Sequence, residues 1–146
     1  MSERRVMVGT DGSPTSYRAV RRAAEIARDL GGPLTMVRAV GPGEPPTRVA
    51  DREGGEGLGY VEGPEDLMAE ARAIAVEVGV PTATAVAVEG DPARVLVGLA
   101  EEQNVELIVV GDQGMNTIAG RLLGSVPTMV AQRAPCDVLI VRTSGD

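Results

Sequence analysis

Histidine, tryptophan and phenylalanine are absent from the 146-residue sequence, and Tyr17 and Tyr60 are its only aromatic residues. Without histidine the chain cannot assemble a Ser-His-Asp or Cys-His catalytic arrangement, nor a His-ligated zinc site. Proteins that bind single-stranded nucleic acids combine aromatic platforms with a basic groove, whereas this chain carries a formal net charge of −7. We therefore expect no nucleic-acid partner, and any bound base would lie between aliphatic side chains.

Cysteine and long apolar runs are equally scarce. Cys136 is the only cysteine and cannot form an internal disulfide, which suits a reducing compartment. The longest apolar runs, at 107–110 and 138–141, are far shorter than the ~20 residues of a membrane helix. The first ten residues show no signal-peptide pattern. We expect a cytoplasmic protein without a membrane anchor, folded as one domain over residues 1–146.

Short apolar runs rich in β-branched residues alternate with helical patterns along the chain. This alternation is typical of a parallel sheet covered on both faces. The predicted strands are 4–10, 34–40, 82–88, 105–111 and 136–142. Helices are predicted from the Ser13-Pro14 pair to Gly31-Gly32, over 64–78, from Asp91-Pro92 to about Asn104, and from near Ser125. The expected fold is a single open parallel five-stranded α/β sheet with helices on both faces.

Residues 41–63 interrupt this alternation with a glycine- and proline-rich segment that has no periodicity. Segments of this length inside compact domains are usually lids, binding loops or disordered insertions. We expect a mobile loop here, and a tolerated surface insertion is favoured over a catalytic lid.

The candidate binding residues follow three of the predicted strands. Ligands of open parallel sheets bind beyond the carboxyl ends of the strands, where the strand order reverses. The segment Gly9-Thr10-Asp11 follows the first strand, and Ala39 lies at the end of the second. Asp11 could accept bonds from a ribose hydroxyl or hold a hydrated cation, although an aspartate that only bonds its own turn is the simpler interpretation.

A glycine motif after the fourth strand carries more information. Gly111, Gly114 and the Gly124-Ser125 pair lie in the connection between a buried strand and a helix. Glycines let the backbone approach an anion without an intervening Cβ, and free N–H groups at a helix start attract phosphate. Ser125 could contact that anion or act simply as the N-cap. The complete motif indicates a phosphate-binding loop.

The sequences VGTDGSPTS near the start, and VVGDQG with AGRLLGSVPTMVAQRAPCDVLIVR near the end, resemble the universal stress protein family over essentially the whole chain. The resemblance implies a Rossmann-like, adenine nucleotide alpha hydrolase-like fold. It also implies an adenine nucleotide, with its ribose at Asp11, its adenine at the backbone of Ala39 and its phosphates on the glycine loop. The residues that we expect at the ligand are Gly9, Thr10, Asp11, Ala39, Val110, Gly111, Gly114, Arg121, Gly124, Ser125 and Val126.

Departures from the family pattern help to choose the ligand. After the first glycine, the family often has a small hydroxyl residue and then a basic one, whereas this chain has Asp112 and Gln113. Many members that bind ATP have serine or threonine where this chain has Pro127, which lacks an N–H donor. Arg121 is the only cation between 111 and 127. ATP would need Mg²⁺, with Asp11 as a ligand, whereas cyclic AMP carries one charge that a helix start could hold unaided.

The segment NTIAGRLLGSVP also resembles the actinobacterial branch of the family in which cyclic AMP is the preferred ligand. We therefore place cyclic AMP slightly ahead of ATP. Two other classes of function remain open. One is an enzyme that slowly hydrolyses ATP or phosphorylates itself, which the sequence supports weakly because it has no histidine base and no P-loop lysine. The other is an interaction module without a ligand.

The predicted terminal strand, 136–142, suggests a protein partner. An apolar strand at the edge of a sheet promotes aggregation unless something covers it, and antiparallel pairing with a second copy would cover it. The family resemblance also implies such homodimers. A helix or loop of the same monomer could cover this strand instead.

Overall fold

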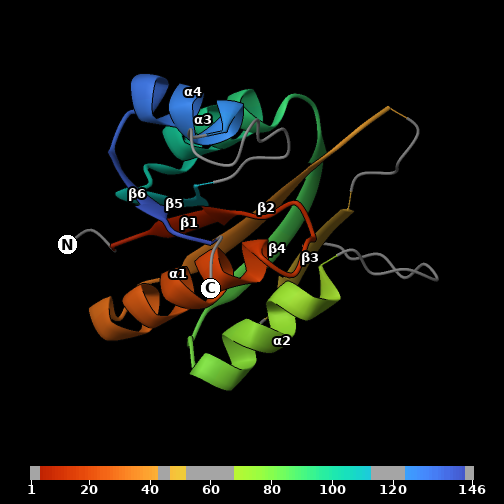
Figure 1. The fold of residues 1–146 in the computed structure, drawn as a ribbon. Helices are drawn as coiled ribbons and strands as arrows, with labels where there is room; N and C mark the ends of the chain where they lie inside the picture. Colours follow the sequence, from red (N-terminus) through yellow and green to blue (C-terminus); the bar gives the residue numbers. More distant parts are fainter. Residues whose placement is uncertain (1–3, 43–46, 52–67, 113–123, 144–146) are drawn as a thin grey trace.

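The computed structural model describes residues 4–42, 47–51, 68–112 and 124–143, which form one sheet between two layers of helices (Figure 1). The strand order is β3-β4-β2-β1-β5-β6. The strands are β1 (Val6–Gly9), β2 (Leu34–Val40), β3 (Thr47–Asp51), β4 (Ala83–Glu89), β5 (Leu107–Gly111) and β6 (Asp137–Val141). No helix in the described ranges is long and apolar enough to cross a membrane.

Five of these strands run parallel, as the sequence predicts. β1 pairs in parallel with β2 on one side and with β5 on the other, and the outer pairs β2–β4 and β5–β6 are also parallel. The sixth strand is a correction to the expected five-stranded sheet. β3 pairs antiparallel with β4 and lies within the 41–63 segment, for which we predicted no regular structure. The rest of that segment beyond Pro42 lies outside the described residues.

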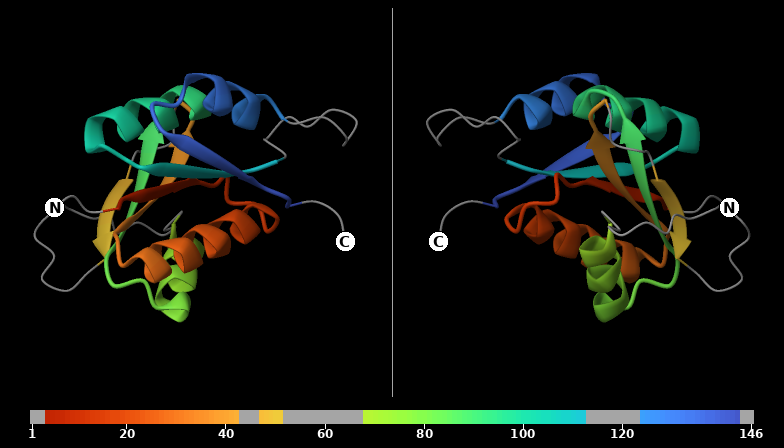
Figure 2. Two further views of the ribbon diagram at one scale, coloured as in Figure 1. Left: turned by 90° about the vertical axis from the view of Figure 1, so that its left-hand side faces the viewer. Right: turned by 90° about the vertical axis from the view of Figure 1, so that its right-hand side faces the viewer.

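Helices cover both faces of the sheet, as Figure 2 shows. The helices are α1 (Ser16–Leu30), α2 (Ala69–Val78), α3 (Pro92–Gln103) and α4 (Ser125–Arg133). α1 and α2 pack on one face, and α3 and α4 pack on the other. Because α3 carries the chain from β4 across the sheet to β5, the strand order reverses on either side of β1.

The ends of the helices follow the expected signals. Asp91 caps α3, since its side chain accepts a hydrogen bond from the Arg94 amide at 3.1 Å, and Pro92 follows at the first position. α1 ends at Gly31, whose φ of 72° suits glycine. The start of α1 differs from the prediction. The helix begins at Ser16, and Ser13 lies three residues upstream, where its hydroxyl oxygen accepts from the Ser16 amide at 3.2 Å.

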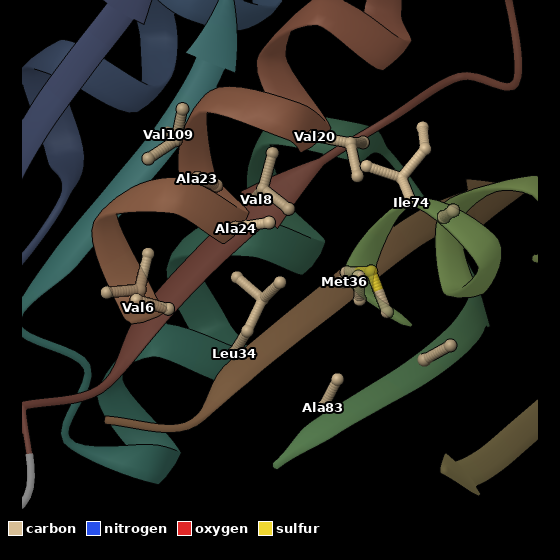
Figure 3. Packing of buried hydrophobic residues seen from close by; sticks show 14 of the residues in the cluster. Val6, Val8, Val20, Ala23, Ala24, Leu34, Met36, Ile74, Ala83 and Val109 are labelled. Atoms are coloured by element: carbon tan, nitrogen blue, oxygen red, sulfur yellow. The ribbon is translucent and has the colours of Figure 1, made fainter. Parts of the chain in front are cut away.

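The core beneath α1 is built from small helix residues against branched strand residues (Figure 3). Val6 and Val8 of β1 and Leu34 and Met36 of β2 are fully buried there. The buried face of α1 consists of Ala19, Val20, Ala23, Ala24 and Ala27. Four alanines on one face let the helix approach the sheet closely, so its axis and its start are fixed relative to β1. This packing places the loop before α1 at the carboxyl end of β1.

Candidate functional site

A pocket lies beyond the carboxyl ends of β1, β2 and β5, where the strand order reverses. Its walls enclose about 550 Å³, including space open to solvent. The lining residues are Gly9, Thr10, Asp11, Ser16, Val37, Ala39, Pro92, Leu96, Val110, Gly111, Val126, Pro127 and Thr143. The pocket therefore lies at the predicted position in the sheet.

The loop between β1 and α1 forms a hydrogen-bonded polar wall. Thr10 is 9% exposed, its Oγ1 accepts from the Gly12 amide at 3.1 Å, and it lies 2.6 Å from the hydroxyl oxygen of Ser16. The Ser16 hydroxyl in turn donates to the carbonyl oxygen of Ser13 at 2.8 Å. Either hydroxyl could be the donor in the contact between Thr10 and Ser16.

Asp11 completes this wall with a carboxylate. Its Oδ1 accepts from the amide of Ser13 at 2.9 Å and from the hydroxyl of Ser13 at 2.6 Å. Within the described residues, Oδ2 receives no hydrogen bond. Thr10, Asp11 and Ser16 therefore offer lone pairs to the pocket, and this wall suits a ligand group that donates hydrogen bonds.

Burial is the largest single influence on the pKa of Asp11, and it acts to raise that pKa. The hydrogen bonds from the hydroxyl and amide of Ser13 oppose it, helped by the nearby hydroxyl of Ser16, and together they bring the pKa below its ordinary value. Asp11 is therefore ionised at neutral pH. As an acceptor, it would meet a ligand hydroxyl in a charge-assisted bond.

Apolar contacts determine the remaining walls and explain two of the predicted glycines. A Cβ added to Gly9 would lie 2.8 Å from Cδ1 of Leu96 in α3. A Cβ added to Gly111 would lie 2.8 Å from Cγ2 of Thr143. We expected Gly111 to make room for an anion and Gly9 to lie beside the ligand, but at both positions the close neighbour is a side chain of the protein. Val37 and Ala39 form the wall on β2.

The start of α4 borders the pocket through Val126 and Pro127. The Gly124 amide donates to the carbonyl oxygen of Asp112 at 3.1 Å, so it is not free for a ligand. Ser125 and Val126 are the first two helical residues, and within the described part of the chain nothing accepts from their amides. Pro127 has no amide proton to give. Among the described residues, two N–H groups at the positive end of a helix dipole therefore remain for an anion.

Asp112 lies next to the pocket but is not among the residues that line it. Its Oδ1 accepts from the amide of Thr143 at 3.0 Å and from the hydroxyl of Thr143 at 2.8 Å. Thr143 is 3% exposed and itself lines the pocket. The carboxylate consequently lies one hydrogen bond behind the pocket wall.

The structure brings most of the predicted site residues together. The pocket contains Gly9, Thr10, Asp11, Ala39, Val110, Gly111 and Val126. Gly124 and Ser125 are at the start of α4, next to the pocket but not part of its lining. Gly114 and Arg121 lie outside the described residues.

The sequence did not predict five of the lining residues. A sixth, Pro127, was considered only because it lacks an amide proton. Pro127 was treated as a missing amide donor, although it also forms part of the wall. The residues that were not foreseen are Ser16, Val37, Pro92, Leu96 and Thr143. Val37 could have been found, because residues two apart on a strand share a face and Ala39 was already proposed. Leu96 and Thr143 carry no local signal, since long-range packing alone brings them to the pocket.

Asp11 was predicted to bind a metal ion only if the ligand is ATP with Mg²⁺. In the described part of the chain, no three acidic or cysteine side chains gather in an arrangement that could hold a metal ion. A Mg²⁺ ion at Asp11 would therefore draw its other ligands from phosphate oxygens and water, as Mg²⁺ commonly does.

Comparison with known proteins assigns the same architecture to a family. A model of the universal stress protein family matches residues 3–142. Universal stress protein Rv1636 of Mycobacterium tuberculosis (strain H37Rv) is 42% identical over 142 residues, which span 95% of this chain and 96% of the relative. A universal stress protein from Thermus aquaticus is 32% identical over 94% of this chain and 97% of its own length.

Solved structures agree with this assignment. A universal stress protein crystallised in complex with cAMP is 40% identical, with a TM-score of 0.76 over 99% of this chain and all of the other. A universal stress protein from Archaeoglobus fulgidus, solved in complex with dAMP, is 22% identical with a TM-score of 0.69 over 97% of this chain and all of the other. At that identity the second likeness supports the fold alone.

Proposed function

This chain belongs to the universal stress protein family, and from that premise we propose that its pocket binds an adenine nucleotide as a regulatory module, with cyclic AMP ahead of ATP. The observation that carries the proposal is the polarity of the pocket. Lone pairs of Thr10, Asp11 and Ser16 form one wall, and the start of α4 borders another, where the amides of Ser125 and Val126 have no acceptor among the described residues. A ribose hydroxyl needs the first wall, and a phosphate needs the second.

The apolar surfaces between these polar ends suit a base. Val37, Ala39 and Leu96 are aliphatic, and backbone groups at the end of β2 can bond the edge of adenine. Among the described residues, no aromatic side chain lines the pocket. The base would therefore be held by aliphatic packing and backbone contacts, as the composition of the chain requires. The 40%-identical relative crystallised with cAMP supports the choice of ligand.

The limited number of anion donors favours cyclic AMP. Of the first amides of α4, the Gly124 amide is used by Asp112 and Pro127 has none, which leaves those of Ser125 and Val126. No lysine or arginine lines the pocket among the described residues. One phosphate charge matches two amides and a helix dipole, whereas the triphosphate of ATP would bring several charges that need cations. Mg²⁺ would be required for ATP only.

Calorimetry with cyclic AMP, ATP and ATP with Mg²⁺ tests the ligand. We expect cyclic AMP to bind more tightly than ATP, with no effect of Mg²⁺ on cyclic AMP. Mass spectrometry of the nucleotide that copurifies with the protein gives an independent answer. Tighter binding of ATP in the presence of Mg²⁺ would reverse the order, and absence of binding by every adenylate would remove the proposal.

Two variants of Ser125 test the place of the phosphate. Ser125→Pro deletes the amide proton at the first helical position, where proline is tolerated. The preceding Gly124 is extended, with φ −65° and ψ 171°, which suits a residue before proline. Ser125→Ala is the matched control, since it removes the hydroxyl and keeps the amide. We expect the proline variant to lose roughly tenfold in cyclic AMP affinity, with adenosine affinity unchanged, and the alanine variant to lose less.

We also propose that two copies of the chain pair through β6 and that the protein works in the cytoplasm. β6 is an edge of the sheet, and its four apolar residues, 138–141, are only half-buried. Antiparallel pairing with a second β6 would cover these side chains and engage the outward backbone groups. The single Cys136 suits a reducing compartment.

A further inference from the structure

Asp112 connects the end of β5 to the end of β6 and to the start of α4. Its amide donates to the carbonyl oxygen of Val141 at 2.8 Å, which ties the end of β5 to the end of β6. Its carbonyl oxygen accepts from the Gly124 amide, so the two ends of the 113–123 connection are held together. The position of the α4 start relative to β5 therefore depends on Asp112.

The side chain of Asp112 adds a negative charge at the same place. Its carboxylate is fixed by the amide and hydroxyl of Thr143, and Thr143 is part of the pocket wall. The backbone of the same residue contacts Gly124, the N-cap of α4. The carboxylate is consequently close to both the pocket and the helix start, although it does not line the pocket.

A fixed negative charge at this position opposes any anion that approaches the amides of Ser125 and Val126. The repulsion grows in proportion to the charge on the ligand. It also weakens the attraction of the helix start, because the carboxylate interacts with the same positive dipole end. Among the described residues, no basic side chain lines the pocket to offset this effect.

We propose that Asp112, held in place by Thr143, is a specificity-determining residue that limits the charge of the ligand this pocket accepts. The inference rests on the proposed nucleotide function and deepens it, because it names the ligand class: adenylates with a single phosphate charge. Asp112 acts through space on the ligand and needs no direct contact with it.

Asp112→Asn provides the decisive test. Asparagine keeps an oxygen that can accept both bonds from Thr143, so the geometry is retained while the charge is removed. Affinities are measured by calorimetry for adenosine, cyclic AMP, AMP and ATP, at low and high salt. We expect adenosine affinity to stay constant and the other affinities to rise by roughly threefold per ligand charge at low salt. High salt should reduce this gain.

Asp137→Asn is the matched control. Asp137 is exposed at the opposite end of β6, paired in register with Leu107 rather than with Gly111. Asp137→Asn changes the net charge by the same amount as Asp112→Asn, so a general charge effect would appear in both variants. We expect the control to bind every ligand as the wild type does.

The outcomes separate this inference from the proposed function. Failure of the wild type to bind adenosine or any adenylate refutes the proposed function. If the wild type binds and Asp112→Asn changes the affinity for every ligand by the same factor, the inference alone is overturned. A uniform loss that includes adenosine also overturns it, because Asp112 would then be purely structural. The urea midpoint of each variant shows whether the fold is retained.

Discussion

Leu96 of α3 packs against the bare Cα of Gly9 at the end of β1. A Cβ on Gly9 would lie 2.8 Å from Cδ1 and 3.3 Å from Cδ2 of Leu96. Leu96 is 3% exposed and lines the pocket together with Gly9. The glycine thus lets the floor of the pocket form where a helix and the central strand meet.

Gly9→Ala should impair the pocket more than it impairs the fold. The added methyl must displace the end of a flexible side chain, and the pocket is the open space beside Leu96. We expect cyclic AMP affinity to fall by about tenfold, while the free energy of unfolding falls by about 1–3 kcal/mol, the usual cost of overpacking. Calorimetry and urea denaturation measure the two effects.

Gly98→Ala is the control for this substitution. Gly98 is an exposed residue of α3, and a Cβ added there meets nothing within 4 Å. Alanine should raise stability by about 0.5–1 kcal/mol and leave binding unchanged. Unchanged cyclic AMP binding in Gly9→Ala would mean that the ligand does not use the floor at Leu96.

Thr10 should be important for stability because its hydroxyl completes a buried chain of bonds. In Thr10→Val, the Gly12 amide loses its acceptor and the Ser16 hydroxyl loses its hydrogen-bond partner. We expect a loss of about 1–3 kcal/mol in the free energy of unfolding, measured in urea. Thr10→Ser keeps the hydroxyl and should stay close to the wild type. A valine variant as stable as the serine variant would show that water replaces these bonds without cost.

The sequence was sufficient for the parts of the site that depend on local patterns. The apolar strands predicted that the sheet is parallel, although they did not predict the strand order. The helix signals at Asp91, Pro92 and Gly31 depend on local residues that the sequence shows directly. The carboxyl ends of β1, β2 and β5 therefore converge as predicted. Residue types alone could not show that Leu96 and Thr143 explain Gly9 and Gly111, because those contacts form between segments distant in the sequence.

Two further differences have physical causes. β3 has no sequence signal of its own, because an edge strand that pairs on one side needs little apolar periodicity. The direction of the Asp112 side chain also could not be predicted, since it depends on Thr143, which follows the last strand. The charge itself was evident in the sequence, but not the wall that separates it from the pocket.

Acid should remove the stabilising contribution of Asp11. Burial acts to raise the pKa of Asp11, but the hydrogen bonds to its carboxylate, those from Ser13 above all, together outweigh burial and lower the pKa in the folded protein. A lowered folded pKa stabilises the protein above the unfolded carboxyl pKa of about 3.9, and that contribution disappears as the pH falls through the folded pKa. Urea unfolding of the wild type and Asp11→Asn from neutral pH to strong acid measures it. The wild-type advantage should be constant near neutrality and shrink in acid. A constant difference throughout would contradict this assignment.

The backbone of β6 shows which residues would join two copies. The carbonyl oxygen of Val141 accepts from the Asp112 amide, so the backbone groups of Val141 face β5. Because these groups alternate along a strand, those of Val138 and Ile140 face the free edge. Proline at an outward position removes a donor from that edge and leaves the bonds to β5 intact.

Val138→Pro should therefore weaken self-association selectively. Val138→Ala is its control, because it also shortens the side chain but keeps the amide proton. Sedimentation equilibrium at micromolar concentration should show wild-type and alanine dimers and a proline variant shifted toward monomer by roughly tenfold or more in dissociation constant, because pairing bonds at the two-fold interface are lost. Urea unfolding checks that the proline monomer keeps its fold. A wild-type monomer would refute the dimer, and an unaffected proline dimer would place the interface elsewhere, since pairing through β6 cannot proceed without its outward amides.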